Sequence, residues 1–84
     1  MENKVLINVE LPAKGETYDF WVPANMTIQA ASDLVADAMQ VIEPDFYKNN
    51  GDAALMYLPT GQIQQPHATI AEIGCTNGDR FVLI

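Results

Sequence analysis

Residues 69–84 read TIAEIGCTNGDRFVLI, and this stretch decides the fold. Its middle, Thr76 to Asp79, has the composition of a tight turn, in which Gly78 can take a positive φ without steric cost. The residues after the turn, 80–84, are apolar apart from the first, as expected of a buried strand. We therefore expect a glycine turn that leads into a last strand.

Alternation gives this last strand two faces. Phe81 and Leu83 fall on one face, and Val82 and Ile84 fall on the other. If Phe81 and Leu83 belong to the core, the other two side chains point away from it.

The first part of the chain predicts two strands joined by a hairpin. In KVLINVELP, residues 4–12, alternate positions are apolar and share one face: Val5, Ile7, Val9 and Leu11. In ETYDFWVP, residues 16–23, one face carries Tyr18, Phe20 and Val22, and the other carries Asp19 and Trp21. Gly15 supplies the positive φ that a hairpin turn between the two strands requires.

Residues 27–42, TIQAASDLVADAMQVI, change to the period of a helix. The expected buried stripe contains Ile28, Ala31, Val35, Ala38 and Ile42, widened by Leu34 and Met39. The expected solvent face contains Gln29, Ser32, Asp33, Asp37 and Gln40. Thr27 is the natural N-cap, and Glu43-Pro44 ends the helix because the residue before proline avoids the helical region.

The rest of the chain predicts short elements. AALMYL, residues 53–58, is a third strand, and the turn PTGQ leads to a fourth around Ile63 and Gln64. Thr69 can cap a short helical turn that buries Ile70 and Ile73. The order is β-β-α-β-β-(short turn)-β, which predicts an α+β fold with one amphipathic helix on one sheet face.

This order resembles the β-grasp, or ubiquitin-like, fold. The resemblance implies a mixed sheet with the first and last strands side by side and parallel at its middle, and one long helix packed across one face. TIAEIGCTNGDRFVLI is similar to the C-terminal pattern of the YukD/EsaB-like ubiquitin-like proteins of Gram-positive type VII (WXG100) secretion systems, with Cys75 where an isoleucine is usual.

The family resemblance implies a function. It implies a single ubiquitin-like domain over residues 1–84, acting as a cytoplasmic component or regulator of the secretion machinery. It implies a protein partner among the subunits of that machinery, and it implies that the chain is not conjugated to other proteins.

Composition and charge exclude several classes of binding partner. With 84 residues, one domain is the expected count. The net charge of -7 repels nucleic-acid phosphates and anionic membranes. It suits a partner with a basic surface, and equally a role in solubility alone. No apolar run is long enough to cross a membrane or to serve as a signal peptide, and the single cysteine fits a reducing cytoplasm.

No catalytic, cofactor-binding or metal-binding residues are expected, so the sequence does not predict an enzyme. Cys75 stands at a core position, and a buried structural thiol is favoured over a reactive one because only Arg80 offers a nearby positive charge. His67 is expected to be exposed, and one histidine with one cysteine cannot form an ordinary zinc site. Ser32, the only serine, has no histidine near it in the sequence.

The candidate protein-binding residues lie on the sheet face away from the helix. Alternation places Met56 and Leu58 on that face, where neighbouring strands would bring them beside Val82 and Ile84. A contiguous exposed apolar patch usually marks an interface, although scattered surface residues of this kind also occur without a role. Trp21 also points outward, either as an interface anchor or as a residue covered by Lys4 or Leu6. A homodimer would satisfy the same observations.

Three functional hypotheses follow. The first is a non-enzymatic, non-conjugated adaptor or regulator of type VII secretion. The second is a conjugated modifier or sulfur carrier, which needs a loose C-terminal glycine; the last residues here, Val82 to Ile84, do not fit that chemistry. The third is a structural or regulatory subunit of a multicomponent enzyme.

Overall fold

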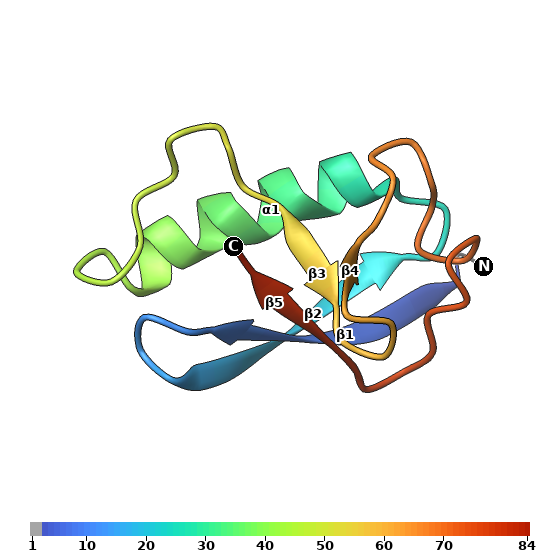
Figure 1. Ribbon diagram of the computed structural model, residues 1–84, viewed down its shortest axis with the longest axis horizontal. Coiled ribbons are helices and arrows are strands. Elements are labelled where there is room, and N and C mark those ends of the chain that lie inside the picture. The colour runs from blue at the N-terminus through green and yellow to red at the C-terminus, as the bar shows by residue number, and fades with distance from the viewer. Residues whose placement is uncertain (1–2) are drawn as a thin grey trace.

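A computed structural model describes residues 3–84 as one helix packed across one face of a mixed five-stranded sheet (Figure 1). The elements are β1 (Lys4–Leu11), β2 (Glu16–Pro23), α1 (Ile28–Ile42), β3 (Leu55–Tyr57), β4 (Gln62–Ile63) and β5 (Asp79–Leu83). The sheet order is β2-β1-β5-β3-β4, with β1 and β5 parallel and the other pairs antiparallel. This is the ubiquitin-like β-grasp fold, and the predicted element order is confirmed.

The strand phases predicted from alternation are correct. The buried side chains of the sheet all lie on the face toward the helix: Ile7, Val9, Leu11, Val22, Leu55, Tyr57, Phe81 and Leu83. The ring centroids of Tyr57 and Phe81 lie 5.0 Å apart at a tilt of 37°, a favourable aromatic arrangement. Ile70, from the segment before β5, closes the core beneath the start of the helix.

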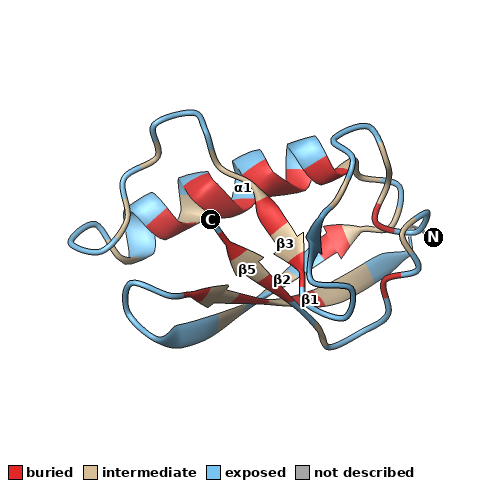
Figure 2. Ribbon diagram, viewed as in Figure 1, coloured by how far each residue is buried: buried red, intermediate tan, exposed pale blue. Residues whose placement is uncertain are grey.

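The helix begins and ends as predicted, but its buried stripe is different. The Thr27 hydroxyl oxygen accepts a hydrogen bond from the Ala30 amide at 3.1 Å, and Glu43 is the C-cap. The buried residues are Ile28, Ala31, Ser32, Val35, Ala36 and Met39. Figure 2 shows this buried side of α1 turned toward the sheet, with the exposed side turned outward.

The prediction was therefore wrong for four helix residues. Ser32 was placed in water but is buried, because its hydroxyl donates to the Ile28 carbonyl oxygen at 2.8 Å and needs no water. Leu34 and Ile42 were placed in the core but are exposed, and Ala38 is only half-buried. The hydrophobicity of these residues favoured a stripe rotated by about one residue from the one that packs.

The later elements are shorter than predicted or shifted by one residue. β3 covers only the middle of the predicted 53–58 strand, although Ala54 and Ile84 extend its pairing with β5 through reciprocal amide-to-carbonyl hydrogen bonds. The predicted cap on the short turn is present in reciprocal form: the Glu72 amide donates to the Thr69 hydroxyl oxygen, and the Thr69 amide donates to the Glu72 carboxylate. Ile70 is buried as expected, whereas Ile73 is only half-buried.

The turn before β5 has the predicted glycine conformation. Gly78 has φ 89°, a value that strains residues with a Cβ. Its amide donates to the Leu6 carbonyl oxygen at 2.8 Å, which ties the turn to β1. The turn thus sets the register in which β5 enters the middle of the sheet.

Candidate protein-binding surface

An apolar row crosses the sheet on the face away from the helix. Met56 on β3 pairs directly with Val82 on β5 and, on its other side, with Ile63 on β4. Side chains of directly paired residues lie about 5 Å apart on the same face. The structure therefore brings Met56 and Val82 together, as the sequence predicts, and adds Ile63.

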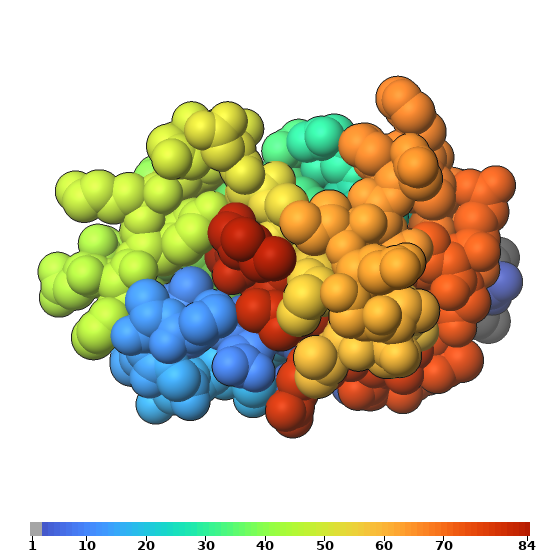
Figure 3. Space-filling model, in the orientation of Figure 1, coloured from blue at the N-terminus to red at the C-terminus, as the bar shows by residue number. Residues whose placement is uncertain are grey.

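Two further predicted residues lie next to this row. Ile84 follows Val82 by two positions and is 59% exposed. Leu58 follows Met56 by two positions, and its amide donates to the Arg80 carbonyl oxygen. We call these five residues the open-face patch: Met56, Leu58, Ile63, Val82 and Ile84. In Figure 3 the C-terminal end of the chain, in dark red, lies at the surface between the yellow-to-orange segment and the blue hairpin.

The sequence predicts Ile63 on a fourth strand but does not assign it to the patch. Ile63 is 58% exposed. The strand it belongs to has only two residues, so alternation alone could not assign its face. The signal that could have found it is its place directly after the PTGQ turn, since a short hairpin would pair it with Met56.

On the same face of the sheet as the open-face patch, a row of polar side chains runs across β5, β1 and β2. We call it the polar row. The Arg80 side chain donates through Nε to the Asn8 side-chain oxygen at 3.0 Å. The Asn8 amide group donates in turn to the Asp19 carboxylate at 2.8 Å. These three residues are direct neighbours on β5, β1 and β2, so the row runs straight across three strands.

Trp21 lies beyond this polar row. It pairs with Leu6, whereas Val82 pairs with Glu10, four residues further along β1. At about 3.3 Å per residue and about 4.8 Å per strand, Trp21 is roughly 16 Å from Val82. Its side chain is 60% exposed, so neither Lys4 nor Leu6 covers it. Trp21 is therefore not part of the open-face patch.

A network of hydrogen bonds fixes the start of β5 and hence Val82. The Asp79 carboxylate accepts from the Thr76 amide at 3.0 Å and from the Tyr57 hydroxyl. These two bonds hold the pKa of the Asp79 carboxyl below its ordinary value, and the bond from the Thr76 amide has the larger effect. Burial, and then the bond to Asp79, raise the pKa of Tyr57. The network joins β3 to the turn before β5 and so keeps Met56 and Val82 in register.

A second network joins the β1–β2 hairpin to the end of the helix. The Glu43 carboxylate accepts from Lys14 Nζ at 2.7 Å and from the Tyr18 hydroxyl. The bond from Lys14, and then the bond from Tyr18, lower the pKa of Glu43. Lys14 Nζ also lies 5.5 Å from the centre of the Phe46 ring.

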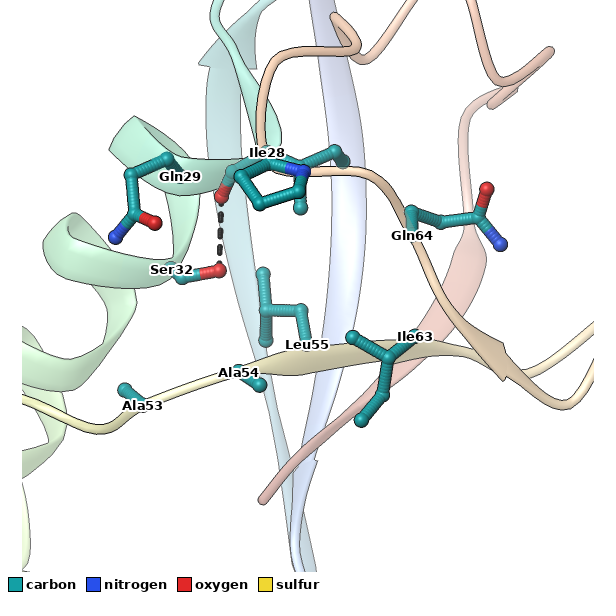
Figure 4. A pocket seen from close by; sticks show the side chains of 9 residues that line it. Ile28, Gln29, Ser32, Ala53, Ala54, Leu55, Ile63 and Gln64 are labelled. Atoms are coloured by element: carbon teal, nitrogen blue, oxygen red, sulfur yellow. Dashed lines mark hydrogen bonds between the residues drawn. The ribbon is translucent and has the colours of Figure 1, made fainter.

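A small open pocket of about 50 Å³ lies between the start of α1 and the β3–β4 region (Figure 4). Ile28, Gln29 and Ser32 line it from the helix, and Ala54, Leu55 and Ile63 line it from the other side. The Ser32 hydroxyl is engaged with the Ile28 carbonyl, as the dashed line in Figure 4 shows. The lining of the pocket is mostly apolar, and the pocket borders the open-face patch at Ile63.

Cys75 and His67 lie where the sequence analysis expected them. Cys75 is buried, and burial, with a smaller contribution from Asp79, raises the pKa of its thiol to about 11. His67 is exposed. Within residues 3–84, no three acidic, histidine or cysteine side chains gather closely enough to hold a metal ion. The helix in this range is also too short and too polar to cross a bilayer.

Comparisons with known proteins agree on the fold. No protein-family model matches the chain, and no curated protein sequence matches it. Among solved structures, Caldiarchaeum subterraneum ubiquitin is 26% identical, with a TM-score of 0.73 over 98% of this chain and 92% of that one. The ubiquitin-like domain of the Mycobacterium tuberculosis type VII secretion protein EccD1 is 12% identical, with a TM-score of 0.76 over 98% of both chains.

A chain in the toluene 4-monooxygenase HD complex is also similar, with 12% identity and a TM-score of 0.78 over 96% of both chains. At such low identities these likenesses establish the ubiquitin-like fold and leave the activity open. One fold thus occurs in a ubiquitin, in a secretion protein and in an oxygenase complex.

Proposed function

We propose that this chain is a single ubiquitin-like domain that acts as a non-enzymatic, non-conjugated adaptor or regulator. It binds a protein partner in the cytoplasm through the open-face patch. The observation that carries the proposal is the direct cross-strand row of Ile63, Met56 and Val82, which forms a contiguous apolar surface. The net charge of -7 favours a partner with a basic surface.

The partner we infer is a subunit of a Gram-positive type VII secretion system. Two observations support this inference. The closing stretch TIAEIGCTNGDRFVLI resembles the YukD/EsaB-like proteins, and the EccD1 ubiquitin-like domain has the same fold over nearly the whole chain. In this proposal the chain docks on the cytoplasmic side of that machinery and does not enter the membrane.

A second candidate function is a structural or regulatory subunit of a multicomponent enzyme. The likeness to a chain of the toluene 4-monooxygenase complex favours it, because 96% of each chain aligns. The same apolar row would then dock on an enzyme subunit.

One capture experiment separates these candidates. A tagged chain is used to capture partners from a lysate of its own host that contains cytosol and solubilised membranes, and the partners are identified by mass spectrometry. The double variant Met56→Asp/Val82→Asp is expected to lose the partner, since each carboxylate would have to be desolvated in the interface. The matched control is Ala71→Asp, which places a carboxylate on an exposed alanine of the turn before β5, outside the open-face patch.

The identity of the captured protein gives the result. Secretion-machinery subunits that depend on Met56 and Val82 support the adaptor, and oxidoreductase subunits support the second candidate. Capture that is lost equally in Ala71→Asp, or kept in the double variant, contradicts binding through the open-face patch. Circular dichroism of the double variant checks that it is folded.

A further inference from the structure

β2 forms one edge of the sheet, and its outer side has no neighbouring strand within residues 3–84. All eight residues from Glu16 to Pro23 have a direct partner on β1, so no bulge interrupts the strand. A lysine, a proline or a bulge in an exposed edge strand usually prevents it from pairing with a strand of another protein. β2 contains no lysine, and its one proline, Pro23, stands at its end. The edge is therefore long and regular enough to accept another strand.

The hydrogen-bond pattern of β1 shows which backbone groups of β2 are available. The Leu6 amide donates to the side-chain oxygen of Asn77, in the turn before β5. The Leu6 carbonyl accepts from the Gly78 amide of the same turn. Both groups thus point away from β2, so the pair Leu6 and Trp21 exchanges no hydrogen bonds. The amide and carbonyl of Trp21 therefore face the free edge. Because the backbone groups of alternate residues in a strand point the same way, the amides and carbonyls of Thr17 and Asp19 also face the free edge.

The helix presents an apolar surface above this edge. We call it the helix flank and define it by Leu34, Ala38, Val41 and Ile42. Their spacing places them along one side of α1. The other side of α1, with Gln29 and Ser32, faces the β3–β4 region across the pocket of Figure 4, so the helix flank lies on the β2 side. Val41 is 81% exposed, the largest value among the exposed large hydrophobic residues.

The two elements that form this surface, α1 and β2, carry acidic residues and no basic ones. The helix contains Asp33 and Asp37 and no basic residue, and β2 contains Glu16 and Asp19 and no basic residue. Lys14, at the hairpin between β1 and β2, is already paired with Glu43. An occupant with positive charge is therefore favoured, and a second copy of this chain, also at -7, is disfavoured.

We propose that the β2 edge and the helix flank together bind an extended segment of a partner protein in which apolar residues alternate with lysine or arginine. The backbone of the segment pairs with Thr17, Asp19 and Trp21 and adds a sixth strand to the sheet. Successive side chains of a strand point to opposite faces, so the apolar ones cover the helix flank and the basic ones reach the face that carries Asp19. This surface is distinct from the open-face patch and is tested separately from it.

Amide hydrogen exchange followed by NMR tests the proposed strand addition. The probe is a synthetic octapeptide of alternating lysine and valine with blocked ends, titrated to millimolar concentration against the intact protein. Exchange of the Thr17, Asp19 and Trp21 amides is expected to slow at least tenfold when the peptide is bound. The amides of Tyr18 and Phe20, which already bond to β1, serve as the internal control and are expected to change little.

Two matched comparisons test the chemistry of the occupant. A peptide with glutamate in place of lysine is expected to bind at least tenfold more weakly, because it meets like charge. Val41→Ser is expected to weaken binding of the lysine peptide about fivefold, since part of a valine side chain is no longer buried. Ile63→Ser, at an exposed isoleucine of the open-face patch, is expected to bind like the original chain.

Several results would overturn the proposal. They are unchanged exchange at millimolar peptide, chemical-shift changes that fall on Met56 and Val82 instead, and equal binding of the lysine and glutamate peptides. A dimer of the protein alone, seen by sedimentation with the Thr17, Asp19 and Trp21 amides already protected, would mean that a second copy is the occupant. That result would also overturn it.

Discussion

The network around Asp79 allows a quantitative test of how the last strand is held. Asp79→Ala removes the acceptor for the Thr76 amide and for the Tyr57 hydroxyl. The bond from the largely buried Tyr57 to a carboxylate contributes about 1.5–2 kcal/mol, and the exposed cap on Thr76 about 1 kcal/mol. The free energy of unfolding is therefore expected to fall by about 2.5–3 kcal/mol. For a chain of this size, the melting temperature is expected to fall by about 10–20 °C.

A double-mutant cycle isolates the contribution of the tyrosine. Tyr57→Phe removes the same hydroxyl bond from the other side, with an expected loss of about 1.5 kcal/mol. The double variant is expected to lose less than the sum of the two single variants, by roughly 1–1.5 kcal/mol, because both act on one bond. Urea unfolding followed by helical circular dichroism is the suitable assay, since Trp21 is largely exposed and its fluorescence reports folding poorly.

The pH dependence of the same variant has a definite sign. The pKa of Asp79 is lower in the folded chain than in the unfolded chain, so its contribution is fully present above the unfolded value and is lost as pH falls through the folded value. The stability difference between the original chain and Asp79→Ala is thus expected to shrink in acid. Asp45→Ala, at an exposed carboxylate after the helix, is the charge-matched control. Additive losses in the cycle, or a difference that grows in acid, would refute the reasoning.

Two further predictions concern the other titrating groups. Glu43→Gln is expected to lower stability at pH 7, because the folded pKa of Glu43 is depressed by Lys14 and Tyr18; urea titrations at pH 7 and in acid should show the difference from the original chain disappearing as pH falls. Cys75 is expected to react with a thiol reagent at pH 8 far more slowly in the folded protein than in urea, since burial raises its pKa to about 11; equal rates would contradict a buried thiol.

The sequence predicts the sheet well because strand alternation tests each face several times. In β1 four apolar residues occupy alternate positions, so a phase error would put all of them in water. The same reasoning assigned Phe81 and Leu83 to the core and Val82 to the outer face, as observed. It could not assign Ile63, because a strand of two residues contains no alternation.

The helix was predicted less well because hydrophobicity alone does not identify the side that packs. α1 carries more apolar residues than the sheet face can cover, so two overlapping stripes were available. The choice between them depended on Ser32, whose hydroxyl is satisfied inside the helix and can therefore be buried. The apolar residues left outside, Leu34 and Val41 among them, became the helix flank. That surface follows from packing and was not visible in the sequence pattern.

The polar row gives the two proposed surfaces a physical reason to act separately. Asn8 uses its side-chain oxygen for Arg80 and its amide group for Asp19, so the row is internally satisfied and fixed across three strands. The polar row lies between the open-face patch and Trp21 at the β2 edge. The exposed apolar residues therefore do not form one large contiguous patch. Because the whole chain carries a net charge of -7, both surfaces favour cationic partners. Two segments of one basic partner could then bind at the same time, and the second would gain from the high local concentration set by the first.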